Sequence, residues 1–141
     1  METTKTILLV EDDAALRLVV KKALEKYGYS VIHAEDSVAA NAMARLRGGI
    51  VDLVLADINL PGLTGGEYAD YLKSINPNLK ILYMSGAPAD ETVQRHLREK
   101  TASFIAKPFK PQELVLAVKK ALGQVPKLTP EDEIELETKN P

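Results

Sequence analysis

The stretch LADINLPGLTG, residues 55–65, decides the fold of this chain. An apolar run of strand length, DLVLA at 52–56, leads into it, so Asp57 should lie where a buried strand ends. In an open parallel α/β sheet the carboxyl ends of the strands share one edge, and ligands bind at that edge. A carboxylate in this place is therefore a candidate for chemistry.

Two further strings repeat the arrangement of polar residues after an apolar run, namely VEDD at 10–13 and FIAKPF at 104–109. If these strands also end at the same edge, Glu11 and Asp12 come close to Asp57 and repel it. A divalent cation and an ammonium group would neutralise the cluster, and Lys107 can supply the ammonium. Carboxylate and carbonyl oxygens suit a hard ion such as Mg²⁺. The three strings together predict a phosphoryl-transfer site.

Strand-like and helix-like segments alternate along the rest of the chain. The expected strands are 7–10, 30–34, 52–56, 79–84 and 103–106, and the expected helices are 14–27, 37–47, 65–75, 89–99 and 111–122. This alternation implies parallel strands joined by right-handed crossovers, and hence an α/β fold.

The 3.6-residue period also predicts which side of each helix is buried. The apolar sets expected to face the core are Leu16, Val19, Val20, Ala23, Leu24 and Tyr27 in the first helix, Val38, Ala42, Met43 and Leu46 in the second, and Tyr68, Ala69, Leu72 and Ile75 in the third. The helix at 89–99 has the thinnest stripe, with little beyond Val93 and Leu97. We therefore expect this helix to be weakly held.

Composition restricts the class of protein. The chain has 141 residues, 45% of them hydrophobic and 27% charged, which suits one globular domain. It has no cysteine, which excludes disulfides and thiolate metal sites. No apolar run has the length of a membrane span, and the amino-terminal residues lack a signal-peptide core, so we expect no membrane association and a cytoplasmic location. No basic stripe suggests nucleic-acid binding.

The composition changes after Gly123. Residues 124–141 carry five acidic residues and two lysines, so they hold a charge of −3, whereas residues 1–123 hold +1. Two interior prolines and the lack of an extended apolar pattern favour a linker or mobile tail. A short helix through EDEIELE, opened at Thr129, is the alternative. We expect one domain over 1–123 and an acidic tail over 124–141.

The order of these motifs resembles the response-regulator receiver domain of two-component signalling, over about residues 5–123. An acidic pair follows the first strand, a lone Asp the third, Ser85 the fourth, and Lys107-Pro108 the fifth. The string DINLPGLTG matches the family's Asp-x-x-x-Pro-x-x-x-Gly loop. The resemblance implies a flavodoxin-like fold, with a doubly wound five-stranded parallel sheet in the order 2-1-3-4-5 flanked by five helices.

The resemblance also implies a role for each site residue. Asp57 would accept a phosphoryl group as an acyl phosphate, assisted by Ser85 and Lys107. Mg²⁺, or Mn²⁺ in its place, would be held by Asp57, by Asp12 directly, by Glu11 partly through water, and by the backbone carbonyl of Asn59. For Asp13, by contrast, we expect a helix N-cap.

The switching residues would be Ser85 and Phe104, with Phe104 turning inward when Ser85 moves toward the phosphoryl group. Lys107-Pro108 is the candidate for the family's cis peptide bond. Ala87 stands where many fast self-dephosphorylating receivers have a polar side chain, which suggests slow or partner-dependent dephosphorylation. His33 and His96 are expected to be surface or filler residues.

The partner implied by the resemblance is a sensor histidine kinase or a histidine phosphotransfer protein. The chain would catalyse only its own phosphorylation and dephosphorylation. Its output face would comprise residues 89–99, 103–106 and 111–122, acting as a monomer or as a weak homodimer through this face. The sequence is compatible with two arrangements, a stand-alone regulator and the receiver of a hybrid sensor kinase. The string NLKILYMSG, residues 78–86, resembles the receivers of hybrid kinases and favours the second arrangement.

Three alternatives compete with this interpretation. A haloacid-dehalogenase-type phosphatase needs Asp-x-Asp-x-Thr/Val after its nucleophile strand, and neither EDDAA nor DINLP provides it. A flavodoxin-like FMN protein needs a Ser/Thr/Gly-rich loop after the first strand, where acids stand instead. A receiver-like module that binds partners without phosphorylation is harder to exclude, although no acid or lysine of the motif is lost.

Overall fold

The computed structural model describes residues 4–46 and 48–124. Strands and helices alternate throughout this part of the chain. The strands are β1 (Thr6–Val10), β2 (Ser30–Ala34), β3 (Leu53–Asp57), β4 (Lys80–Ser85) and β5 (Ser103–Ala106). The helices are α1 (Ala14–Lys26), α2 (Ser37–Leu46), α3 (Gly65–Ile75), α4 (Glu91–Arg98) and α5 (Pro111–Ala121). Each predicted element is present, and no end is displaced by more than two residues.

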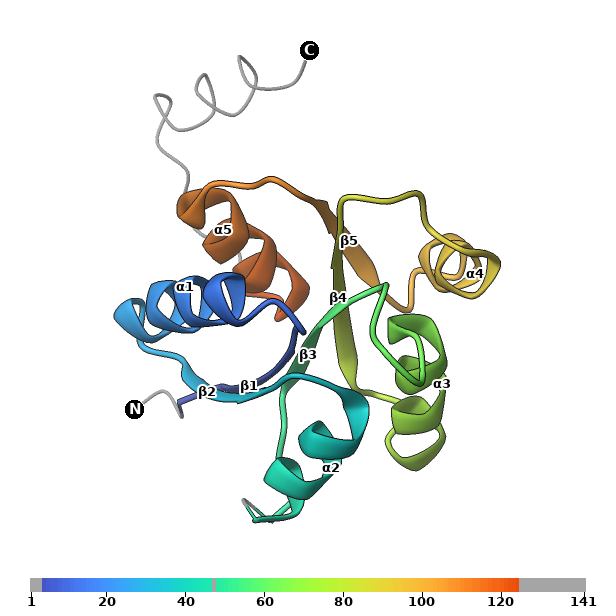
Figure 1. Cartoon of the computed structure of the whole chain (residues 1–141), viewed down its shortest axis with the longest axis horizontal. Coiled ribbons are helices and arrows are strands. Elements are labelled where there is room, and N and C mark those ends of the chain that lie inside the picture. Colours follow the sequence, from blue (N-terminus) through green and yellow to red (C-terminus); the bar gives the residue numbers. More distant parts are fainter. Residues whose placement is uncertain (1–3, 47, 125–141) are drawn as a thin grey trace.

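The five strands form one parallel sheet in the order β2-β1-β3-β4-β5, as predicted. α1 and α5 cover one face of the sheet, and α2, α3 and α4 cover the other (Figure 1). Because both faces are covered, the central strands are apolar throughout rather than alternating, and all five residues of β3 are buried. The described part of the chain therefore has two hydrophobic cores, one on each side of the sheet.

The face of α2 that was predicted to be buried is in fact exposed, so that prediction was wrong. Val38 is 78% exposed and Leu46 81%, whereas the buried residues of α2 are Ser37 and Ala40. Small residues let the helix lie close to the sheet, and its larger side chains then point away from it. Asn41 also faces inward, where its Oδ1 accepts a hydrogen bond from the buried Tyr68 hydroxyl at 2.9 Å.

The other faces were predicted in part. In α1, Val20 and Leu24 are buried as expected, but Val19 and Tyr27 at the margins of the stripe are 55% and 48% exposed. In α3, Tyr68 and Ala69 are buried, and Ile75 in the last turn is not. The predicted stripes were thus wider than the contact that each helix makes with the sheet.

No described helix has the length and apolar character needed to cross a membrane. The acidic tail predicted over 124–141, and its alternative helix through EDEIELE, lie outside the described residues except for Gln124. Gln124 Oε1 accepts a hydrogen bond from the Tyr29 hydroxyl at 2.8 Å.

The inverted burial of α2 can be tested with a matched pair of substitutions. We expect Leu46→Ala to change the free energy of unfolding by less than about 0.5 kcal/mol, because the side chain already lies in water. Leu24→Ala removes a fully buried side chain from the core and should cost about 3 kcal/mol. Urea denaturation measures both. An equal loss in the two variants would contradict the orientation described for α2.

Candidate functional site

The polar residues singled out in the sequence meet at one edge of the sheet. Glu11 follows the last residue of β1, Asp57 and Ser85 are the last residues of β3 and β4, and Lys107 follows β5. Because the strands are parallel and in register, all four residues lie at the carboxyl edge. The topology therefore brings together side chains that are up to 96 residues apart in the sequence.

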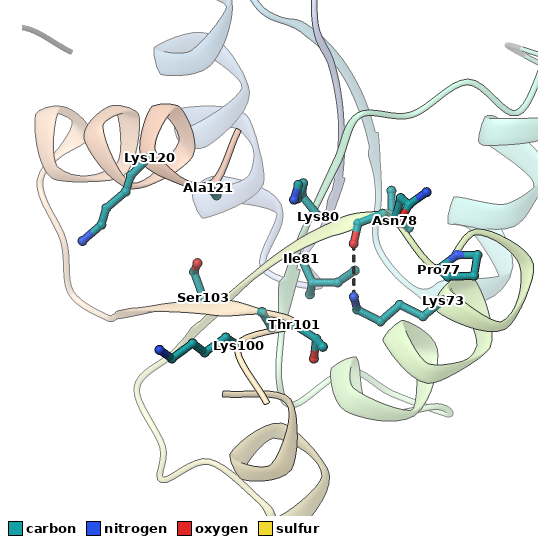
Figure 2. A pocket seen from close by; sticks show the side chains of 12 residues that line it. Lys73, Pro77, Asn78, Lys80, Ile81, Lys100, Thr101, Ser103, Lys120 and Ala121 are labelled. Atoms are coloured by element: carbon teal, nitrogen blue, oxygen red, sulfur yellow. Dashed lines mark hydrogen bonds between the residues drawn. The ribbon is translucent and has the colours of Figure 1, made fainter. Parts of the chain in front are cut away.

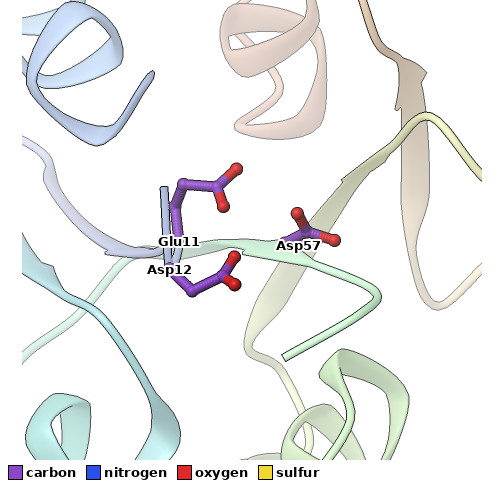
Figure 3. A group of neighbouring side chains, drawn as sticks. All are labelled: Glu11, Asp12 and Asp57. Atoms are coloured by element: carbon purple, nitrogen blue, oxygen red, sulfur yellow. The ribbon is translucent and has the colours of Figure 1, made fainter. Parts of the chain in front are cut away.

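Three carboxylates form the centre of this edge. Glu11, Asp12 and Asp57 each offer an oxygen, and these oxygens lie within 4.8 Å of one another. Glu11 and Asp12 turn toward the side on which Asp57 lies (Figure 3). Glu11 is fully buried and Asp57 is 7% exposed, while Asp12 is open to solvent. The expected clustering of the three acids is thus observed, with one member accessible from outside.

The Lys107 ammonium holds two of these acids. Its Nζ donates to Glu11 Oε1 at 2.5 Å and to Asp57 Oδ2 at 2.6 Å. Burial lowers the pKa of Lys107, but the hydrogen bonds to Asp57 and Glu11 outweigh this effect and leave the pKa above its ordinary value. Burial raises the pKa of Glu11, and the hydrogen bond from Lys107 only partly opposes it. The ammonium is therefore what makes a buried glutamate tolerable here.

The charges at this edge do not cancel within the protein. With all groups ionised, the three carboxylates and one ammonium leave a formal charge of −2, which is the charge that a divalent cation balances. The donors are all oxygens, and the exposed Asp12 leaves the cluster open to water, which hard ions such as Mg²⁺ keep as ligands. The residues therefore fit such an ion.

The loop after β3 holds the Asp57 carboxylate in place. The Asn59 amide donates to Asp57 Oδ1 at 2.8 Å, and the Gly65 amide donates to the Ile58 carbonyl at 2.9 Å. A Cβ added to Gly65 would lie 2.3 Å from the Asp57 carbonyl oxygen, so only glycine allows α3 to begin this close to the strand end. Thr64 caps α3 through a capping box with Glu67.

Asp13 differs from its two acidic neighbours. Its side chain accepts a hydrogen bond from the Leu16 amide at 3.1 Å, so it is the N-cap of α1, as expected. Its own amide donates to Glu11 Oε2 at 3.1 Å. The Asp13 amide thus holds Glu11 Oε2, and the Lys107 ammonium holds Glu11 Oε1.

The two residues expected to switch lie on neighbouring strands. Ser85 is buried, and its Oγ accepts a hydrogen bond from the Ala87 amide at 3.0 Å. Phe104 pairs with Tyr83 across β4 and β5, and the residue is 37% exposed. The Lys107 amide donates to the Ser85 carbonyl at 2.9 Å, and the Lys107-Pro108 peptide bond is cis. Phe104 is therefore partly exposed while the Ser85 hydroxyl is hydrogen-bonded within its own loop.

The structure corrects the interpretation of His96 as a surface or filler residue. His96 is 3% exposed on α4, and its Nδ1 lies 2.6 Å from the Tyr83 hydroxyl. Its Nε2 lies 2.7 Å from Asp70 Oδ1, and Arg95 also donates to Asp70, at 2.9 Å. Burial raises the pKa of Asp70, but the hydrogen bonds and charges of His96 and Arg95 outweigh it and leave the pKa lowered.

This chain of hydrogen bonds joins α4 to β4 and α3, so α4 does not depend on Val93 and Leu97 alone. The sequence interpretation missed it because it counted only apolar residues. One pattern could have indicated it, since His96 lies three residues after Val93 and therefore on the same side of the helix. Nothing in the sequence pointed to Tyr83 or Asp70 as its partners.

Comparison with known proteins gives matches over most of the chain. Residues 7–119 match the family model described as the response regulator receiver domain. The response regulator receiver protein CpdR of Brucella abortus is 37% identical over 118 residues, which cover 84% of this chain and 97% of CpdR. The sensor kinase CckA of the same organism is 32% identical over 117 residues, but these cover only 12% of its length and 83% of this chain.

The fold also matches solved structures. The crystal structure of the receiver domain of NtrX from Brucella abortus aligns with a TM-score of 0.72 and 34% identity, covering 83% of this chain and 98% of that one. A CheY-like receiver domain protein from Methanospirillum hungatei aligns with a TM-score of 0.76 and 28% identity, covering 94% and 99%. The similarity thus includes both the sequence and the arrangement of its elements.

The electrostatics of the site can be tested by two substitutions of opposite effect in metal-free buffer. We expect Asp12→Asn to raise the free energy of unfolding by about 0.5 kcal/mol, because it removes a like charge. Lys107→Met should lower it by about 2 kcal/mol, because the buried Glu11 loses its counter-charge. Thermal and urea unfolding in the presence of a chelator measure both. A decrease for Asp12→Asn would contradict the crowding of the three acids.

Proposed function

Since the chain belongs to the response regulator receiver domains, we propose that it accepts a phosphoryl group on Asp57 from a phosphohistidine of a sensor kinase or histidine phosphotransfer protein. The observation that carries this proposal is the contact of one ammonium, Lys107, with both Asp57 and the buried Glu11 beside an exposed Asp12. A purely structural ion pair has no need of the third carboxylate.

Within this proposal each residue has a distinct task. Glu11, Asp12, Asp57 and the Asn59 carbonyl would hold Mg²⁺, or Mn²⁺ in its place. The bound cation would supply positive charge to the phosphoryl oxygens, which the acidic cluster otherwise repels. Lys107 is close enough to Asp57 to contact the transferred group as a point charge. The loop hydrogen bond from Asn59 keeps the Asp57 carboxylate oriented for attack.

The transfer step involves one bond formed and one broken. A carboxylate oxygen of Asp57 attacks phosphorus, and the phosphorus–nitrogen bond of the donor histidine breaks. The imidazole leaves with the bonding electron pair and takes up a proton from solvent. Lys107 then exchanges one of its two carboxylate contacts for a phosphoryl oxygen, which loosens its hold on Glu11 or Asp57.

Switching would follow from the position of Ser85. To bond a phosphoryl oxygen, its hydroxyl must give up the hydrogen bond from the Ala87 amide. Phe104, on the neighbouring strand, would then turn inward from its exposed position. The output face proposed for this change comprises α4, β5 and α5, through which the chain would act as a monomer or weak homodimer.

Two finer expectations accompany the proposal. Ala87 offers no polar side chain to orient an attacking water, so self-dephosphorylation should be slow or should depend on a partner. We expect the activity to be cytoplasmic, where the kinase domains that donate phosphoryl groups act.

The phosphoacceptor can be identified by labelling. A small activated phosphodonor with Mg²⁺ should add one phosphoryl group, which intact-mass measurement detects, and Asp57→Asn should abolish the addition. Chelation of the metal should reduce labelling by at least tenfold, because the acceptor then repels the donor.

Asp13→Asn is the matched control for this experiment. It also replaces a carboxylate with an amide at the same edge, but asparagine caps a helix as well as aspartate does. Labelling should therefore persist in Asp13→Asn and be strongly reduced in Asp12→Asn. Undiminished labelling of the Asp57→Asn variant would contradict the proposed acceptor.

The proposed output face can be tested by amide hydrogen exchange with beryllofluoride as the phosphoryl mimic. We expect altered exchange in residues 89–106, where α4 and β5 lie, because the hydrogen bonds of Ser85 and the position of Phe104 change. Peptides from α2 should be unaffected and serve as the internal reference. Changes confined to the loops around Asp57 would show that the site binds phosphate without transmitting it.

A further inference from the structure

A basic hollow lies at the edge of the sheet opposite Asp57. Its volume is about 380 Å³, and the polar residues that line it are Lys73, Asn78, Lys80, Lys100, Thr101, Ser103 and Lys120. They come from α3, α5, the first residues of β4 and β5, and the connections that lead into these two strands (Figure 2). None of the described residues that line it is acidic. Four lysine residues thus line one concave surface, and no acidic residue stands among the described residues of its lining.

The ammonium groups influence one another. Burial, and then the charge of Lys80, lower the pKa of Lys73 below its ordinary value. Lys73 Nζ donates one hydrogen bond, to the Leu79 carbonyl at 3.2 Å, which leaves two of its three N–H groups for another acceptor. Lys73 is therefore held in place at the wall of the hollow with donors to spare.

Lys100 stands in a backbone conformation that disfavours it. It follows α4 with φ of +59°, and the Thr101 amide donates to the His96 carbonyl across it at 2.9 Å. The positions just after α1, α2 and α5 also have positive φ, and they are occupied by Gly28, by Gly48 and Gly49, and by Gly123. A lysine at such a position costs about 1 kcal/mol relative to glycine. This cost indicates that the side chain itself has a use.

The ends of helices explain only part of this cluster. Lys73 and Lys120 lie in the last turns of α3 and α5, where a cation interacts favourably with the helix dipole. Lys80 begins a strand, and the favoured residue at the position of Lys100 is glycine. These two lysines are therefore additional to what helix capping requires.

We propose that this hollow binds a phosphate-rich anion, namely a pyrophosphate group, either free or as part of a nucleotide. Lysine ammonium groups bind phosphate oxygens as point charges, and the hydroxyls of Thr101 and Ser103 can donate further hydrogen bonds. The volume is sufficient for a group of this size. The site is separate from Asp57, because β4 places its first residue, Lys80, and its last, Ser85, at opposite edges of the sheet.

The proposal is tested by titrating the full chain with pyrophosphate and, separately, with a nucleoside triphosphate. The buffer contains a chelator and low salt, so that the acidic site takes no part. Amide chemical shifts in NMR report where each anion binds. We expect saturable shifts in residues 73–81 and 100–103 with both anions, competition between them, and none with the nucleoside alone. Asp57→Asn should not change the affinity.

The decisive variant is Lys100→Gly. It removes one ammonium and supplies the residue that the backbone prefers, so the melting temperature should stay the same or rise. The affinity for pyrophosphate should fall about threefold, and the Lys80→Gln/Lys100→Gly double variant should lose about tenfold. Lys22→Gln, an exposed lysine on α1, is the control and should lose less than 1.5-fold.

Two results would overturn the proposal. One is the lack of saturable shifts in the hollow at millimolar pyrophosphate. The other is an equal loss of affinity in Lys22→Gln and Lys100→Gly, which would show that the anion responds to the net charge of the chain and not to the hollow. Neither result affects the proposed phosphorylation of Asp57, which the labelling experiment tests separately.

Discussion

The contact of the Lys107 ammonium with Glu11 and Asp57 is the interaction on which the rest of the site depends. It joins the ends of β1, β3 and β5, so a single cation spans much of the carboxyl edge. A carboxylate as buried as that of Glu11 is ordinarily costly, and it is stable here only because the cation is within hydrogen-bond distance. Any event that moves the Lys107 ammonium away leaves Glu11 and Asp57 without their counter-charge.

The residues at this edge could be predicted from the sequence, because a parallel sheet requires only that the ends of its strands be recognised. Once apolar runs and helices alternate, the residues after each strand must meet at the same edge, whatever the packing details are. Asp57, Glu11, Asp12 and Lys107 could therefore be placed together from strand ends alone. The capping role of Asp13 was equally accessible, since it depends on the local chain and not on tertiary contacts.

Features that depend on tertiary contacts could not be predicted in this way. The apolar period of α2 gave the wrong face, because small residues, not large ones, fill the narrow space between this helix and the sheet. The partners of His96 are 13 and 26 residues away, on β4 and α3. A polar side chain at a buried helical position is ambiguous until its partners are known. The result is a helix α4 held by hydrogen bonds as well as by Val93.

The polarity of the fold explains why opposite charges gather at its two edges. In each β-α-β unit the helix starts near the carboxyl edge and ends near the amino edge, so the dipoles of all five helices point the same way. Basic residues in the last turns of the five described helices accordingly lie toward the amino edge. The acidic residues Glu11 and Asp12 at the opposite edge come just before the amino end of α1, which begins after Asp13. Lys80 and Lys100 do not lie in the last turn of a helix, so the helix dipoles do not account for them. These two lysines therefore support the proposed anion site, whereas the lysines of the last turns are explained by helix capping alone.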